Sequence, residues 1–71
     1  MNQKEMILEM LKDGWILNPL KCLKEIGCMR LAARIGELLD EGYPIESKLV
    51  SDTNRFGKRI QYSEYWMKVQ P

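Results

Sequence analysis

Residues 18–45 read NPLKCLKEIGCMRLAARIGELLDEGYPI, and this stretch decides the fold. Asn18 can cap a helix whose first position is Pro19, and Gly27 can end that helix in the left-handed conformation. A further helix is expected to begin almost at once, at residue 28 or 29, and to run to residue 41. Pro44 forbids its continuation. The stretch therefore predicts two helices joined by a short turn that contains glycine.

The spacing of the apolar residues predicts which side of each helix is buried. The residues expected in the core are Leu20, Leu23 and Ile26 in the first of these helices, and Leu31, Ile35, Leu38 and Leu39 in the second. The lysines and the glutamate of the first helix then point outward. Both helices are expected to pack through these residues against the flanking segments of the chain.

The flanking segments complete the predicted order. Asn2 can cap a helix over about residues 3–12, and the apolar run at 15–17 is long enough for a short strand. After Pro44 the sequence predicts a strand at 45–50, a turn-rich loop at 51–57 and a second strand at 58–67. Trp15 and Trp66 are expected in the core. A helix pair followed directly by a hairpin is a winged helix-turn-helix, so the expected fold is α+β, with three helices, a short strand between the first two, and a C-terminal hairpin wing in a single domain over 1–71.

Composition excludes several classes of function. The chain has 71 residues and no histidine, so it lacks a histidine-based nucleophile pair or zinc site. With no Gly-rich phosphate loop either, we expect no enzyme, metal, cofactor or small-molecule substrate. Cys22 and Cys28 have apolar neighbours and are interpreted as small buried hydrophobes, not as a disulfide, which favours the cytoplasm. No apolar run is long enough to span a membrane, and no signal peptide is expected.

The outward face of the helix after Gly27 is unusual for a solvated helix. A helical wheel places small or flexible residues on its N-terminal half, with arginines along one flank. The residues expected to face a DNA major groove are Met29, Arg30, Ala33 and Arg34. Arginine can reach phosphates or the guanine edge, and small residues let the helix backbone come close. The alternative is that the arginines pair with Glu37 and Glu41 as ordinary surface charges.

The net charge of +1 hides an uneven distribution. Residues 1–27 are neutral, residues 28–47 carry −2, and residues 48–71 carry +3. At the hairpin tip, the residues expected to contact the phosphate backbone or the minor groove of DNA are Asn54, Arg55, Lys58 and Arg59. A basic tip can instead protect an edge strand from aggregation. Phe56 either folds back as core or is an exposed contact.

The stretch 27–35, GCMRLAARI, followed by Leu38 and by EGYPIE at 41–46, resembles a family of short helix-turn-helix domains found mostly in small phage and prophage proteins. The resemblance extends back to Ile7 and forward to Tyr65, and so covers nearly the whole chain. It implies a winged-helix fold and binding to double-stranded DNA, but no particular operator.

Two classes of function follow from these observations. The leading hypothesis is a small DNA-binding protein, a transcriptional regulator or an accessory factor in DNA transactions. A domain of this size contacts few base pairs, and useful specificity usually needs two copies on paired half-sites, so a homodimer is one possibility and the sequence leaves the oligomeric state open. The competing hypothesis is a winged-helix module that binds a host protein without binding DNA.

Overall fold

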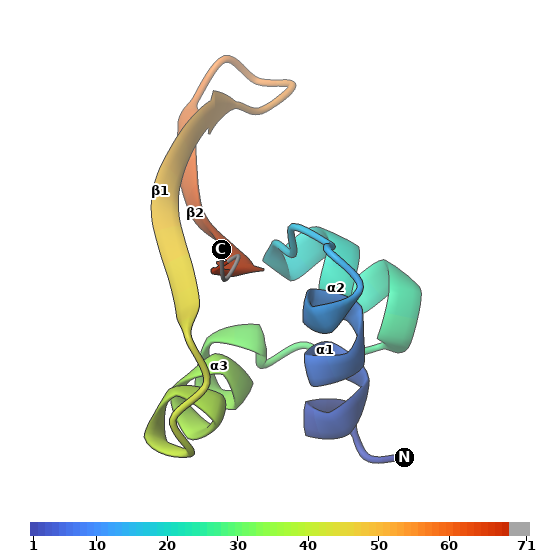
Figure 1. Ribbon diagram of the computed structural model, residues 1–71. Helices are drawn as coiled ribbons and strands as arrows, with labels where there is room; N and C mark the ends of the chain where they lie inside the picture. Colours follow the sequence, from blue (N-terminus) through green and yellow to red (C-terminus); the bar gives the residue numbers. More distant parts are fainter. Residues whose placement is uncertain (69–71) are drawn as a thin grey trace.

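Asparagine caps begin the first two helices of the computed structural model, which describes residues 1–68 (Figure 1). In α1 (Gln3–Lys12) the Asn2 Oδ1 accepts the backbone N–H of Glu5 at 2.8 Å. In α2 (Pro19–Ile26) the Asn18 Oδ1 accepts the N–H of Lys21 at 2.7 Å. Each cap satisfies a donor that a helix leaves free at its first turn, so both predicted starting points are confirmed.

The turn between α2 and α3 (Leu31–Asp40) is longer than predicted. Gly27 has φ +72°, and its N–H donates to the carbonyl of Leu23 at 2.9 Å. This bond is that of an αL C-cap, and the Cys28 N–H also reaches back to the carbonyl of Cys22 at 3.4 Å. Because Cys28 is used to close α2, the next helix begins only after Arg30. The prediction that it begins at residue 28 or 29 is therefore wrong.

The hairpin consists of β1 (Ile45–Thr53) and β2 (Arg59–Met67), paired antiparallel with Ile45 opposite Met67 and Thr53 opposite Arg59. The first strand is longer than the predicted 45–50. Leu17 forms an isolated β-bridge with Tyr65, in which the two residues exchange backbone hydrogen bonds of 2.8 Å. In Figure 1 the hairpin rises from the helices, and its tip stands clear of them.

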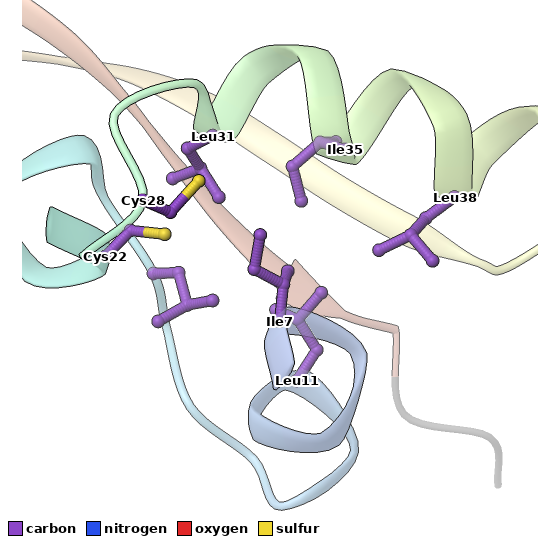
Figure 2. Packing of buried hydrophobic residues seen from close by; sticks show 8 residues of the cluster. Ile7, Leu11, Cys22, Cys28, Leu31, Ile35 and Leu38 are labelled. Atoms are coloured by element: carbon purple, nitrogen blue, oxygen red, sulfur yellow. The ribbon is translucent and has the colours of Figure 1, made fainter. Parts of the chain in front are cut away.

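The core lies where the three helices meet the base of the hairpin. Its buried residues are Ile7, Leu11, Leu17, Cys22, Cys28, Leu31, Ile35 and Leu38 (Figure 2). Both cysteines are free and fully buried, as expected of small apolar residues. The backbone hydrogen bond from Cys28 to Cys22 brings the two residues together at the end of α2. Burial raises the pKa of Cys22 to about 12.

The prediction for the core side of α2 is wrong for Leu20 and Leu23 and correct for Ile26. Leu20 is 74% exposed and Leu23 is also exposed, whereas the α2 residues that turn inward are Cys22, which is buried, and Ile26, which is half-buried. Cys22 and Ile26 are four residues apart and lie on one side of a two-turn helix. A small thiol at the contact lets α2 sit close to its neighbours, so the leucines end on the opposite side.

Smaller corrections concern large side chains at the margin of the core. Leu39 is exposed, because Leu31, Ile35 and Leu38 alone form the inner stripe of α3. Trp15 is exposed and Trp66 is half-buried, so neither is a core residue in the expected sense.

The described helices are too short and too polar to cross a membrane. The predicted order of elements is otherwise the observed one.

Candidate nucleic-acid interface

The segment that leads into α3 presents an exposed surface of mixed chemistry. Met29 is 83% exposed, Arg30 is exposed immediately before the helix, and Ala33 is exposed in its first turn. Arg30 makes no ion pair with any residue of 1–68. A Cβ added to Gly36 would meet nothing within 4 Å, so this glycine does not serve close packing inside the molecule. The first half of α3 therefore lets another surface approach its backbone closely.

Arg34 differs from the other residues that were expected to face a groove. It is half-buried, and its Nη1 donates to Glu37 Oε1 at 2.7 Å. Its Nε is buried without a hydrogen-bond partner among the described residues. Arg34 and Glu37 line a cavity together with the first residues of α1, Asn2 to Lys4. The side chain thus lies toward α1, and for Arg34 the structure has the ion pair that the sequence offered as the alternative.

The C-terminal end of α3 is acidic. Asp40 and Glu41 are both exposed there, and Glu41 forms an ion pair with Lys4 of α1 at 2.5 Å. The hydrogen bond to Glu41 raises the pKa of Lys4. A polyanion is repelled by exposed carboxylates, so the N-terminal end of α3 is the end that can approach one.

The loop at the hairpin tip is held by one side chain. Asn54 Oδ1 accepts the backbone N–H of Phe56 at 2.9 Å and that of Lys58 at 3.0 Å. The main chain of Asn54 also donates to the carbonyl of Lys58 and accepts from Gly57. Gly57 has φ +78°, a conformation that favours glycine. The tip is thus a closed turn with a defined shape, and Asn54 is its organising residue.

The closed turn projects charge and an aromatic ring into solvent. Arg55, Lys58 and Arg59 are exposed, and none of them makes an ion pair with residues 1–68. Phe56 is 82% exposed, so the interpretation of this residue as core is wrong and the exposed alternative is correct. The sequence carries the signal for this outcome, because an asparagine three residues before a glycine is typical of a tight turn.

The structure gathers the expected contacts into two separate groups. The α3 group is formed by α3 and the segment before it, and its members are Met29, Arg30, Ala33 and Arg34. The tip group lies at the far end of the hairpin (Figure 1), and its members are Asn54, Arg55, Lys58 and Arg59. A nine-residue strand is about 30 Å long. The hairpin therefore carries the tip group well away from the helices (Figure 1).

A different exposed surface is apolar. Leu20 and Leu23 of α2 are exposed, as are Trp15 and Ile16 in the segment that precedes it. Trp15 and Ile16 also line a groove of about 370 Å³ beside Trp66.

Comparison with known proteins gives one result that concerns the whole fold. A family model described as a winged helix-turn-helix domain matches residues 2–70. No curated protein and no solved structure matches the chain. The matched range includes the three helices and the hairpin, and hence both groups of candidate contacts.

Proposed function

We propose that this chain, which belongs to the winged helix-turn-helix domain family, binds double-stranded DNA. The observation that supports this most directly is the hairpin tip, where Arg55, Lys58 and Arg59 are exposed without acidic partners among residues 1–68. These three cations lie within five residues of one projecting turn. Phosphates supply the missing counter-charge, and their neutralisation releases condensed ions.

The α3 group is proposed to read base edges. Arg30 is exposed and unpaired within the described chain, and it stands between exposed Met29 and the first turn of α3. An arginine in that position can donate two hydrogen bonds to guanine, while Ala33 and the methionine can pack on apolar base atoms. Arg34 is proposed as a weaker contact, because reaching DNA costs its ion pair with Glu37.

The tip group is proposed to follow the backbone. Lys58 and Arg59 stand at the start of β2 and Arg55 stands inside the turn, so the three cations occupy one end of the hairpin. Asn54 positions them by fixing the turn. Contacts of this kind set the register of the protein on the duplex but carry no direct sequence information.

The proposal predicts different behaviour for the two groups. Replacing Arg30 by alanine weakens binding to the preferred sequence by about 1–3 kcal/mol and relaxes specificity. Replacing Lys58 by alanine weakens binding to all duplexes alike. Lys12→Ala removes the same charge from α1, outside both groups, and serves as the matched control.

The experiment combines selection of bound duplexes from a random pool with mobility-shift titration at two salt concentrations. Selection yields the preferred sequence and the symmetry of the site in one step. Binding that weakens with salt and a recovered consensus support the proposal. No shift on any duplex, including the DNA upstream of its own coding sequence, rejects it.

The biological role is proposed by the same reasoning. We propose a transcriptional regulator or an accessory factor in DNA transactions, acting in the cytoplasm, like the small phage and prophage proteins that the sequence resembles. A homodimer on paired half-sites extends the few base pairs that one domain can contact. Light scattering on the protein with and without its selected duplex measures the number of copies.

A second candidate function is a protein-interaction module. It is favoured by the exposed leucines of α2, since Leu20 and Leu23 stand on the side away from the core. Leu20→Ala and Leu23→Ala separate the two functions. They abolish co-purification of a host protein if α2 is a docking surface, and they leave DNA binding nearly unchanged if the chain acts through α3 and the hairpin tip.

A further inference from the structure

Phe56 is the one feature of the hairpin tip that phosphate binding does not use. Its ring is 82% exposed at the end of a projecting hairpin. The ring has no hydrogen-bonding group, so it gains nothing from phosphate oxygens. The aromatic side chain therefore needs a partner that is apolar, or that has a π face.

The turn fixes the backbone from which the ring projects. The backbone N–H of Phe56 is bound to Asn54 Oδ1, and the next residue, Gly57, donates to the Asn54 carbonyl at 3.0 Å. Phe56 itself and the residue that follows it are thus held by the same asparagine. Because the backbone is fixed, the ring is presented to a partner in advance, and little conformational entropy is lost when it binds.

The surroundings of the ring define the chemistry of that partner. Arg55 precedes Phe56 directly and Lys58 follows two residues later, and neither is paired with an acidic group of residues 1–68. The nearest carboxylate in sequence, Asp52, accepts the N–H of Thr53 at 2.7 Å. The partner must therefore be strongly anionic and must offer an apolar slot within a few ångströms of its charges.

A DNA minor groove meets both requirements, because phosphates border it and base steps can open in its floor. Proteins that bind there insert apolar side chains between base pairs and kink the duplex by about 20–90°. We propose that Phe56 is such a wedge, placed between adjacent base pairs while the neighbouring cations bind the flanking phosphates. This inference rests on the proposed DNA binding and adds a deformation of the duplex to it.

The wedge gives the tip a sequence preference without hydrogen bonds to bases. Pyrimidine–purine steps such as TpA unstack easily, whereas A-tracts are stiff. The hairpin tip is therefore expected to favour a duplex with a TpA step at the position of Phe56. This preference adds to the reading of base edges that is proposed for α3.

The test measures bending and affinity separately. Duplexes of about 30 base pairs carry a fluorophore at each end and either a central TpA step or a central A-tract. Energy transfer reports bending, and titration of the same signal or of anisotropy reports affinity. The variants are Phe56→Ala and, as a matched control, Leu49→Ala, which removes an apolar side chain that is 63% exposed on β1. Thermal melting of each variant verifies the fold.

The wild type is expected to increase energy transfer on the TpA duplex and to bind it more tightly than the A-tract duplex. Phe56→Ala is expected to lose the bending, and its affinity for the TpA duplex to fall roughly five- to hundredfold, the effect of removing one stacked aromatic. Its affinity for the A-tract duplex changes by less than about threefold, because the cations remain. Leu49→Ala behaves as the wild type.

Three results overturn the proposal in distinguishable ways. Binding without bending by the wild type, or equal bending by Phe56→Ala, rejects the wedge and leaves the proposed DNA binding intact. Absence of binding to any duplex rejects both. If Phe56→Ala instead loses binding to vesicles of anionic phospholipid and keeps its DNA bending, the ring serves a membrane surface and the wedge is rejected.

Discussion

Leu17→Ala and Leu20→Ala remove the same atoms from two leucines that stand three residues apart, and we predict opposite outcomes. Leu17 is fully buried and its backbone bonds to Tyr65 of β2, so its side chain joins the hairpin to the helices. Leu20 is 74% exposed on the outer side of α2. Comparing the stabilities of the two variants therefore tests both which residues form the core and which side of α2 is buried.

The expected magnitude follows from burial. Removing three carbons from a fully buried side chain loses about 2 kcal/mol of transfer free energy, and the cavity left behind raises the total to about 3–4 kcal/mol. A chain of this length has a free energy of unfolding of about 4–11 kcal/mol, so the Leu17 variant loses a large part of its stability. Leu20→Ala is expected to change the free energy of unfolding by less than about 0.5 kcal/mol.

Urea unfolding followed by tryptophan fluorescence measures both variants. With an m-value of about 1 kcal/mol/M, Leu17→Ala lowers the midpoint by about 3 M and Leu20→Ala by less than about 0.5 M. The assignment of Leu17 to the core and Leu20 to the surface is wrong if both variants lose the same free energy of unfolding, or if Leu17→Ala loses less than about 1 kcal/mol. The first outcome would mean that α2 packs through its leucines.

Further predictions concern glycine, thiol and turn chemistry. Gly36→Ala is expected to raise the free energy of unfolding by up to about 1 kcal/mol in urea titrations, because the added Cβ meets nothing and the helix gains propensity. Gly27→Ala is expected to lower it by about 1 kcal/mol or more, since φ is +72° at that position. Burial, then the hydrogen bond with Cys28, raises the pKa of Cys22 from 9.0 to about 12. The stability gained by holding this thiol protonated is therefore complete below pH 9.0 and is lost as the pH rises toward 12, and alkylation at pH 9 should require unfolding. Asn54→Ala is expected to speed amide hydrogen exchange in the hairpin turn by about tenfold, a loss of about 1.4 kcal/mol of local protection, and mass spectrometry can verify it.

Local signals were sufficient to predict the helix ends that have their own caps. Asn2 and Asn18 each bond to a backbone N–H of the first turn, and Gly27 closes α2, so these positions depend on few distant contacts. The start of α3 was predicted wrongly because it has no side-chain cap, and because Cys28 is used by the preceding turn. Where a short strand was expected between the first two helices, the structure has a single bridge of Leu17 to Tyr65.

The side of α2 that is buried could not be predicted from its own sequence. In two turns of helix, the leucines and the pair formed by Cys22 and Ile26 define competing faces, and only packing against the other helices selects one of them. Prediction of the candidate site was limited in the same way, because contacts outside the local sequence decide it. The sequence offers both a groove contact and an ion pair for Arg34, and the approach of α3 to α1 selects the pair with Glu37.

The dependence of DNA affinity on salt tests the central claim most directly. The tip cations Arg55, Lys58 and Arg59, as three phosphate contacts, predict a slope of about −2.7 in a plot of log K against log salt concentration. Replacing the three tip residues by alanine should reduce the steepness by about 2.7, because each lost phosphate contact contributes about 0.9. A slope near zero for the wild type, or the same slope for the triple variant, would contradict the account.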